Sequence, residues 1–409
     1  MFQATIQEAD GKAIFDKFKI RATPTVMMLE PDGSELDWIV GYDPPAEDYQ
    51  AGVDKAFKGI DTYKSLAAQN AKNPQDIAVL FKLAQKWDDR YDHEKAADLY
   101  KQVLALDPNG TKGTTEYGRN KEQVSYAECA EFNIGASAMS KRPPDPAPLR
   151  AFVKKYPDGT IVKDAYTRMG SYYGRQAAKE DATKFFEEYT GRFPQEGSAY
   201  LGWANRVLLD KEPVDKGIAL AQKAVELVQG RSKTAGYQTL GRLYLLKGDK
   251  EKSVETADQL LKAAQAPRAK PSEIPATRIN PAMLAAPMAA RIYADAGRPD
   301  KALAVYGPEF LEANMENSGV LGRYAQFWAT QGQNLDSALA AAKKVTELAP
   351  DSFNSYTTLS TVYQKLKNYD EALKAAEKAL SIAPAQPPQI KETIQKTIES
   401  IKASGAEKK

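Results

Sequence analysis

The apolar residues of this chain recur at helical spacing from about residue 60 onward, and the pattern repeats about every 34 residues. The clearest repeat is FNSYTTLSTVYQKLKNYDEALKAAEKALSIAP, residues 353–384, which reads as two amphipathic helices closed by Pro384. A single helix pair cannot bury its apolar face, so the pattern predicts a stack of such pairs. Seven repeats begin near Leu80, Tyr166, Gly197, Tyr237, Met283, Leu321 and Phe353.

Each repeat has a small residue at the eighth position of its first helix and another near the start of its second helix. The two helices of a pair must nearly touch at these positions, and a large side chain would separate them. All fourteen residues are small, which strongly indicates the repeat. They are Ala84, Gly170, Ala204, Gly241, Ala290, Ala325 and Ser360 on the first helices, and Ala96, Ala182, Gly217, Ser253, Ala302, Ala338 and Ala372 on the second.

Two segments depart from the regular repeat. Residues 118–157 are predicted to hold an eighth, degenerate helix pair, which contains the proline-rich connection SKRPPDPAP, residues 140–148. Residues 266–281 are a second proline-rich stretch. Both stretches are expected to be loops within the array, because repeats continue on each side of them.

The first 58 residues follow a different pattern. Phe2–Gln7, Thr25–Leu29 and Glu35–Val40 read as strands, and EPDG between the last two reads as a tight turn. Short helices are predicted at GKAIFDKF and over Ala46–Phe57. The expected order is strand, helix, hairpin, helix.

This order, with RATPT before the hairpin and VGY after it, resembles the C-terminal part of a thioredoxin-like domain. The resemblance implies that the bond before Pro24 is cis, a form that costs only about 0.5–1 kcal/mol for proline, and that Thr23 faces the family's active site. The CxxC motif of the family has no counterpart in this chain. Two interpretations stay open: Thr23 and Pro24 cradle a peptide, or the loop persists because the hairpin needs it.

In the thioredoxin-like family a further strand lies between the counterparts of Phe2–Gln7 and Thr25–Leu29. Without that strand the sheet would have unpaired edges at its centre. We therefore expect another segment, from upstream or from a partner, to fill the gap.

The helical repeats resemble tetratricopeptide repeats. The resemblance implies a mainly α fold, a right-handed superhelical α-solenoid over residues 59–404, with an amphipathic capping helix after Pro388. An incomplete thioredoxin-like domain at residues 1–58 would precede it, and residues 405–409 are expected to be a disordered tail.

In the tetratricopeptide family the first helices line a concave groove that holds an extended peptide or a partner helix. The corresponding residues here are polar and mildly basic, which favours an acidic or C-terminal carboxylate ligand, because arginine binds a carboxylate through two parallel hydrogen bonds. They do not match the family's carboxylate clamp of paired Lys and Asn, and the alternative is that they are ordinary solvated surface residues. They are Arg168, Asn205, Gln238, Arg242, Arg291, Arg323 and Gln326.

Composition excludes several classes of function. The 56 Lys and Arg nearly balance the 54 Asp and Glu, and a net charge of +2 predicts neither nucleic-acid binding nor attraction to anionic lipid. No apolar run approaches the roughly 18 residues that a membrane helix needs. One cysteine, Cys129, and one histidine, His93, cannot form a disulfide within the chain, a Cys/His zinc site or a redox pair.

No catalytic, cofactor or metal site is expected. Cys129 stands where the repeat expects a buried small residue, and His93 is expected to be a solvated turn residue. The sequence has no phosphate loop, GxSxG or HExxH motif.

The favoured function is a non-catalytic scaffold that binds a protein or peptide. The alternative is a thiol-disulfide oxidoreductase or redox chaperone whose CxxC lies upstream of Met1 and whose repeats recruit clients. The compartment stays open between the cytoplasm and, if an upstream signal peptide exists, the periplasm or the exterior. The oligomeric state is not predicted.

Overall fold

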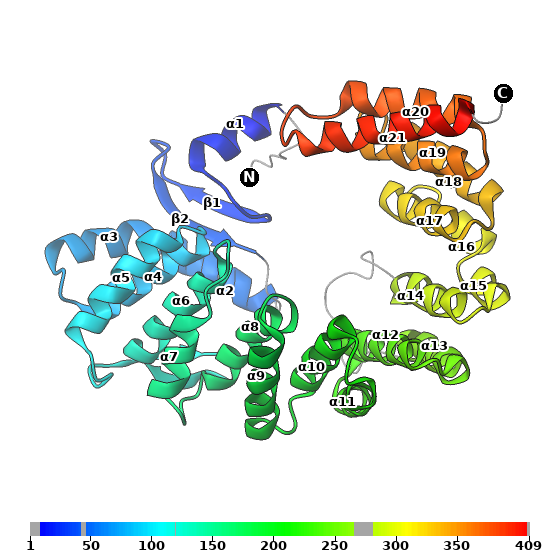
Figure 1. Cartoon of the computed structure of the whole chain (residues 1–409). Coiled ribbons are helices and arrows are strands. Elements are labelled where there is room, and N and C mark those ends of the chain that lie inside the picture. Colours follow the sequence, from blue (N-terminus) through cyan, green and yellow to red (C-terminus); the bar gives the residue numbers. More distant parts are fainter. Residues whose placement is uncertain (1–8, 42–45, 119, 266–280, 407–409) are drawn as a thin grey trace. The chain divides into compact units, whose positions relative to one another are not determined.

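The computed structural model describes residues 9–41, 46–118, 120–265 and 281–406 (Figure 1). The chain divides into two compact units, the first ending at Arg206 and the second beginning at Val207. This boundary lies within helix α10 (Gly197–Asp210). Both units are mainly helical.

The N-terminal region has two helices and one hairpin. The strands pair antiparallel, with Thr25 opposite Val40 and Met27 opposite Trp38, and the turn between them passes through Gly33, whose positive φ of 80° suits glycine. The elements are α1 (Ala9–Phe18), β1 (Thr25–Leu29), β2 (Glu35–Val40) and α2 (Ala46–Phe57).

The predicted hairpin and both predicted helices are confirmed, and the Thr23–Pro24 bond is cis as expected. The predicted strand Phe2–Gln7 lies outside the described residues. The prediction that another segment fills the gap beside β1 depends on that strand and is therefore not tested. In the described part of the region the sheet has two strands. A thioredoxin-like domain therefore stays a prediction.

The hairpin is fixed to the first helix pair by the side chain of Arg90, which is 5% exposed. Its guanidinium donates to the Glu35 carboxylate and to the carbonyl oxygen of Lys86 (2.7 Å), and it lies 3.7 Å from Asp37. The same group stacks on Tyr63, with 4.5 Å between the guanidinium carbon and the ring centroid. We call Arg90 with its partners the Arg90 junction.

The rest of the first unit is a row of helix pairs. Helices begin at capping side chains: Asp76 accepts from Val79 N, Asp92 from Lys95 N and Ser125 from Glu128 N. The pairs are α4 (Ile77–Asp89) with α5 (His93–Leu106), α6 (Tyr126–Ser140) with α7 (Ala147–Lys155), and α8 (Val162–Arg175) with α9 (Lys179–Arg192); α3 (Tyr63–Lys72) precedes them. The predicted degenerate pair is thus confirmed as α6 and α7.

A second hairpin, which the sequence pattern does not predict, lies between α5 and α6. It pairs β3 (Thr114–Tyr117) with β4 (Glu122–Ser125). The Tyr117 hydroxyl donates to Asp164 Oδ2 on α8 (2.6 Å), and its ring meets Phe132 on α6 edge to face.

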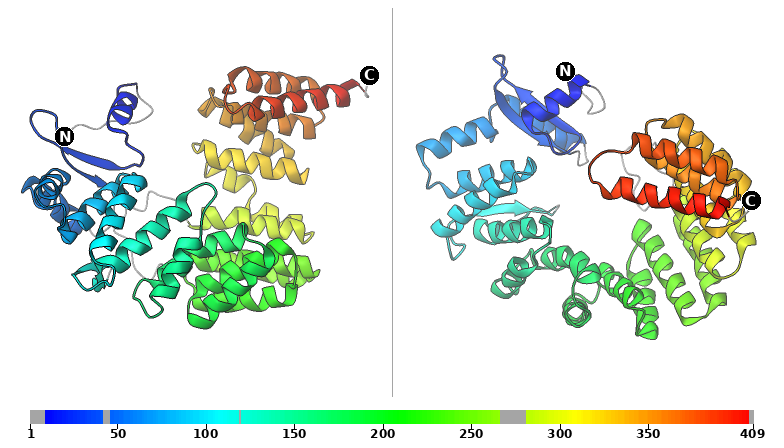
Figure 2. Two further views of the ribbon diagram at one scale, coloured as in Figure 1. Left: turned by 60° about the vertical axis from the view of Figure 1, so that its left-hand side comes forward. Right: turned by 45° about the horizontal axis from the view of Figure 1, so that its top comes forward.

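The second unit, taken by itself, is also a row of helix pairs (Figure 2). The first helices of successive pairs contact each other, α12 with α14 and α17 with α19. Its elements are α11 (Val214–Leu227), α12 (Gly230–Lys247), α13 (Lys250–Gln265), α14 (Pro281–Asp295), α15 (Pro299–Val305), α16 (Pro308–Glu312), α17 (Ser318–Gln331), α18 (Leu335–Leu348), α19 (Phe353–Lys365), α20 (Tyr369–Ile382) and α21 (Gln389–Ala406).

Two boundaries differ from the prediction. The second helix of the α14 repeat ends at Val305, and a short helix begins at Pro308. Gly307 lies between them. A Cβ on Gly307 would lie 2.2 Å from Leu303 O, so only glycine fits at this turn. The capping helix α21 continues to Ala406, two residues beyond its expected end.

Thirteen of the fourteen small residues are buried, as their predicted position between helices requires. Gly170 is the exception: it is half-buried, and a Cβ built on it would have only Tyr189 Cε1 within 4.0 Å. In two pairs a serine closes the contact directly, because Ser253 Oγ donates to Gly241 O (3.0 Å) and Ser360 Oγ donates to Ala372 O (2.8 Å). A side chain larger than serine would have no room at this distance.

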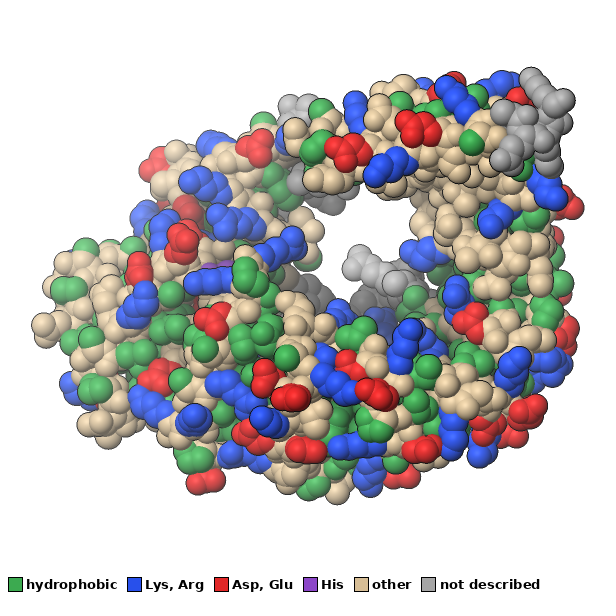
Figure 3. Space-filling view, viewed as in Figure 1, with side chains coloured by type: hydrophobic (Ala, Val, Ile, Leu, Met, Phe, Trp, Pro, Cys, Tyr) green, Lys and Arg blue, Asp and Glu red, His purple; other side chains and the backbone are tan. Residues whose placement is uncertain are grey.

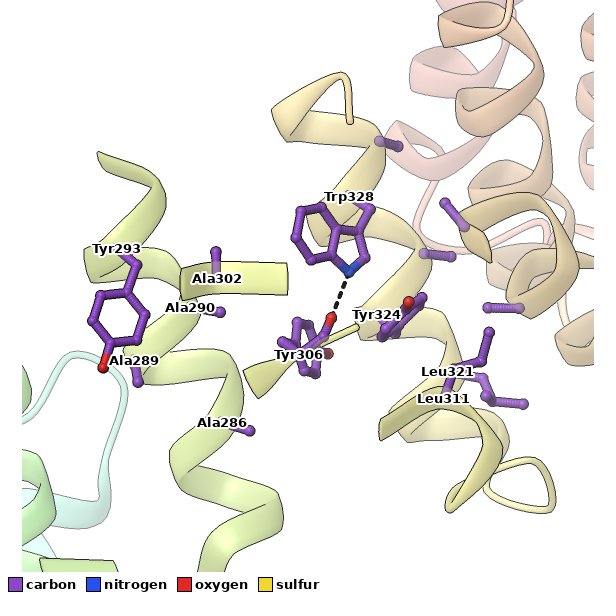
Figure 4. Packing of buried hydrophobic residues seen from close by; sticks show 14 of the residues in the cluster. Ala286, Ala289, Ala290, Tyr293, Ala302, Tyr306, Leu311, Leu321, Tyr324 and Trp328 are labelled. Atoms are coloured by element: carbon purple, nitrogen blue, oxygen red, sulfur yellow. Dashed lines mark hydrogen bonds between the residues drawn. The ribbon is translucent and has the colours of Figure 1, made fainter. Parts of the chain in front are cut away.

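Aromatic residues fill the space between pairs in the second unit (Figure 4). Trp328 is 1% exposed, and its indole N–H donates to Tyr306 O at 2.8 Å. The Tyr306 ring lies 5.1 Å from that of Tyr324, while Ala290 and Ala302 bring the neighbouring helices α14 and α15 together. This cluster joins the α14 repeat to the α17 repeat.

Candidate functional site

The residue that follows the small contact residue of each first helix is accessible in every repeat. A step of one residue turns about 100° around a helix, so this residue points away from the second helix of its own pair. Within each unit, we call the surface formed by these residues and their neighbours one turn away the first-helix face of that unit. The seven residues are Gln85, Ser171, Asn205, Arg242, Arg291, Gln326 and Thr361; Thr361 is half-buried and the others are exposed.

Four of the predicted groove residues, Asn205, Arg242, Arg291 and Gln326, occupy this position. Gln238 lies one helical turn before Arg242 and is half-buried. The remaining two, Arg168 and Arg323, lie two residues before the small residues of their helices and are exposed. Arg168 and Asn205 belong to the first unit and the other five belong to the second.

Carboxylate binding by Arg242 and Arg291 requires guanidinium groups that are not already paired within their own repeats. Arg291 does not meet this condition, because its Nε lies 2.9 Å from Asp295 Oδ2. The physical reason is the i, i+4 spacing, which places the two side chains one turn apart on α14. Arg242 is exposed and forms no ion pair with any residue in the described part of the chain.

A pocket of about 250 Å³ opens on the first-helix face of the first unit. Residues of α8, α9 and α10 line it, and its two aromatic residues, Phe186 and Tyr189 of α9, are 0% and 1% exposed. We call it the α8–α10 pocket. Its lining residues are Thr167, Gly170, Ser171, Gly174, Arg175, Phe186, Tyr189, Ser198, Leu201, Gly202 and Asn205.

The hydroxyl groups around this pocket already have partners inside the protein. Thr167 Oγ1 donates to Lys163 O (3.0 Å) and lies 2.8 Å from the hydroxyl of Tyr189, which can donate to it. Ser198 Oγ donates to Glu196 Oε1 (2.8 Å). Burial raises the pKa of Tyr189, so its hydroxyl stays neutral. The hydroxyl groups of Thr167, Tyr189 and Ser198 are therefore already hydrogen-bonded within the protein.

A larger pocket, of about 570 Å³, lies where the N-terminal region covers the first-helix face of α4. Charged groups line it, but several are paired: Lys82 with Asp61 at 2.9 Å and Lys86 with Asp37. Asp89 faces the pocket, and desolvation by the surrounding protein raises its pKa. Sequence reasoning missed this pocket because its walls are far apart in the chain.

A third opening, of about 510 Å³, separates α19 from the capping helix α21. Threonines line both sides, and their hydroxyls donate to their own helices, as Thr361 does to Thr357 O (2.9 Å) and Thr397 does to Thr393 O (3.0 Å). Their methyl groups are left to face the opening.

The residues singled out for redox chemistry are not arranged for it. Thr23 and Pro24 are exposed at the start of the first hairpin. Cys129 is buried as predicted, and burial raises the pKa of its thiol to about 12. His93 differs from the expected solvated turn residue: it begins α5, is half-buried, and its Nδ1 lies 3.0 Å from Asp88 Oδ1.

Two further searches covered the described residues. They contain no group of three or more His, Cys, Asp or Glu side chains that could hold a metal ion. None of their helices is both long and apolar enough to cross a membrane. In the view of Figure 3 acidic and basic side chains are interspersed over the surface, in keeping with the small net charge.

Comparison with known proteins identifies the repeats. A sequence model of the tetratricopeptide repeat family matches residues 235–267 and 353–386. These two ranges contain most of the pair α12 and α13 and the whole of the pair α19 and α20. No curated protein matches the chain.

Several solved structures match the chain at low identity and low TM-score. One is YrrB, described as a TPR protein with an unusual peptide-binding site: 20% identity, TM-score 0.30, covering 52% of this chain and 97% of that chain. A tetratricopeptide repeat protein from Parabacteroides merdae has 13% identity and a TM-score of 0.42, covering 67% and 98%. The APC/C hetero-tetramer Cut9–Hcn1 has 14% identity and a TM-score of 0.38, covering 81% and 58%.

Proposed function

We propose that this tetratricopeptide repeat protein is a non-catalytic scaffold that binds an extended peptide, or an extended segment of a partner protein, on its first-helix face. The observation that carries the proposal is the open first-helix face itself. In each repeat the residue after the helix contact is accessible and polar, and only on α4 does the N-terminal region lie over part of this face among the described residues.

The arrangement supports binding rather than catalysis. A nucleophile or general base needs a neighbouring group that activates it. On the first-helix face the accessible side chains are mainly amides, hydroxyls and guanidinium groups such as Asn205, Gln326 and Arg242. These groups donate and accept hydrogen bonds along a polypeptide, and arginine adds a preference for carboxylates.

Binding on this face can be tested by blocking it. Peptides selected from a random display library on the purified full chain provide the ligands. A bulky maleimide attached at Asn205→Cys or Arg242→Cys is expected to lower their binding at least about tenfold, because it occupies the face that the ligand needs. The single native thiol does not interfere, since Cys129 is buried.

The matched controls place the same label on exposed positions of second helices, Lys184→Cys on α9 and Lys262→Cys on α13. These variants should bind normally. Equal loss at all four positions, or a folded chain that selects no peptide, would contradict the proposal.

The competing function, a thiol-disulfide oxidoreductase or redox chaperone, requires a reactive thiolate. Burial raises the pKa of the Cys129 thiol to about 12, so little of it is thiolate near neutral pH. We expect the native chain to react with an aromatic disulfide reagent much more slowly than the chain unfolded in guanidinium chloride. Insulin reduction by the purified chain should equal the buffer blank, and turnover that disappears in Cys129→Ser would contradict the prediction that this chain has no redox activity of its own.

A further inference from the structure

We infer that the first hairpin is a built-in ligand of the helix array, and that the surface it occupies on α3 and α4 can instead bind an acidic extended segment of a partner protein. The inference rests on the proposed function. It adds the chemistry of the ligand, and it identifies the part of the chain with which the ligand competes.

The strand β2 is itself an extended acidic segment seated on the first helices of the array. It contacts both α3 and α4 (Figure 1). Side chains two residues apart point to the same side of a strand, and Glu35 and Asp37 have this spacing. Arg90 donates to Glu35, and Lys86 donates to Asp37. The hairpin therefore shows, within one chain, how cations at the C-terminal end of α4 bind alternate carboxylates of a strand.

The two sides of this contact carry opposite charges. Residues 25–40 contain no Lys, Arg or His, and their four charged residues are Glu30, Asp32, Glu35 and Asp37. On the array, Lys64 of α3 lies 2.8 Å from Glu30 and joins the two cations of α4. We call Lys64, Lys86 and Arg90 the α3–α4 surface. Because charge complementarity depends on the carboxylates and not on the chain that carries them, another segment with the same carboxylates fits this surface.

The attachment of the hairpin leaves polar groups unsatisfied. The indole N–H of Trp38 and Nε of Arg90 are buried, and neither has a hydrogen-bond acceptor in the part of the chain that the structure describes. Each has lost its hydrogen bonds to water without replacement, which weakens the attachment. The pocket of about 570 Å³ also stays open there, lined by Ile39 of the hairpin and Asp89 of α4. Ion pairs are therefore a large part of what holds β2, and a ligand that supplies the same carboxylates can replace them.

The contacts also specify the residue after the second carboxylate. The Arg90 guanidinium carbon lies 4.5 Å from the ring centroid of Tyr63 and 5.0 Å from that of Trp38. Tyr63 belongs to the array, whereas Trp38 directly follows Asp37 on the strand. A guanidinium group is attracted to the face of each ring. The expected ligand therefore has two carboxylates two residues apart, followed by an aromatic residue.

A labelled nonapeptide with the sequence of residues 33–41, GSELDWIVG, tests the inference by fluorescence anisotropy on the full chain. In the native chain the hairpin already occupies the α3–α4 surface. The double variant Glu35→Gln, Asp37→Asn removes the carboxylates of the internal strand, so the surface is free more often. We expect the peptide to bind the double variant at least about tenfold more tightly than the native chain. A hairpin with only a structural role would not produce this gain.

Two controls and one further measurement accompany this test. Asp32→Asn with Asp98→Asn removes the same number of carboxylates from exposed positions, and this chain should bind the peptide as the native chain does. A peptide with Gln and Asn in place of its Glu and Asp should bind the double variant at least about tenfold more weakly. In the native chain, saturating peptide should speed hydrogen exchange in β1 and β2 and leave that of α8 unchanged. This last measurement needs no substitution, so it decides the matter if the double variant does not fold.

Three results would overturn the inference. They are equal affinity of the peptide for the native chain and the double variant, equal affinity of the two peptides for the double variant, or unchanged exchange of the hairpin at saturating peptide. If library-selected peptides still bind and are blocked by the label at Asn205, only this inference fails; if no peptide is selected, the proposed function fails as well. A dimer in sedimentation equilibrium that the double variant converts to a monomer would assign the α3–α4 surface to the hairpin of a second copy and exclude a partner protein as its occupant.

Discussion

Replacing Arg90 with methionine is expected to destabilise the attachment of the first hairpin to the helix array by about 3 kcal/mol. The guanidinium is buried between two carboxylates and an aromatic ring, and its loss would leave the Asp37 carboxylate, whose side chain is 4% exposed, with Lys86 as its remaining cation. Hydrogen exchange followed by mass spectrometry should show amides of β1 and β2 exchanging about a hundredfold faster.

Two further variants isolate the cause. Arg298→Met removes an exposed arginine that pairs with Asp300 at 2.6 Å, and it should change exchange little, because surface pairs contribute about 0–1 kcal/mol. Arg90→Met combined with Asp37→Leu removes both buried charges and should recover part of the loss. Unchanged protection of the hairpin in Arg90→Met would show that the Arg90 junction does not hold it.

Trp328→Ala should lower the stability of the second unit by about 3–5 kcal/mol, the range found when a buried aromatic side chain is truncated. The indole is almost fully buried, fills the space between α15 and α17, and its N–H satisfies the carbonyl of Tyr306. Truncation would leave both a cavity and an unpaired buried carbonyl.

The loss should be local, because each repeat of such an array contacts mainly its neighbours. Amides of α14 to α18 are expected to lose protection in hydrogen exchange, while those of α4 and α5 keep theirs. Trp328→Phe keeps most of the apolar volume and should cost less than half as much. If Trp328→Ala and Trp328→Phe were equally mild, the cluster around Tyr306 would not be what joins the two repeats.

The helix pairs could be predicted because their cause is local and periodic. Small residues such as Ser253 and Ser360 recur at fixed positions, and the structure shows them within hydrogen-bond distance of the facing helix. The first hairpin was predictable for the same reason, since its strands alternate and its turn contains Gly33. In each case the residues that determine the element lie close together in the sequence.

What the sequence did not predict depends on distant partners or on weak patterns. The strands TTEY and EQVS of the second hairpin are short and polar, so they carry little alternation. The Arg90 junction joins residues 55 positions apart. The pairing of Arg291 with Asp295, in contrast, was visible in the sequence as an i, i+4 pair.

The candidate site shows the same division. Sequence reasoning found the accessible positions of the first helices, among them Asn205 and Arg242, but treated Gly170 only as a helix contact. That a Cβ at Gly170 would meet empty space depends on how Tyr189 and Phe186 of the next helix are oriented. A pocket forms where several helices pack together, so it cannot be recognised from the sequence of one helix alone.

The hydrogen bond from Tyr117 to Asp164 has a consequence for how the first unit unfolds. An array in which each repeat touches only the next can lose its repeats one at a time from an end. The β3–β4 hairpin leaves the chain between the α4 and α6 pairs yet is bound to α8, so it skips over an entire pair. Tyr117 thus contacts both the α6 and the α8 pair, so opening either pair alone would break a contact of the hairpin, and we expect this to couple the unfolding of these two pairs more closely than nearest-neighbour packing alone would.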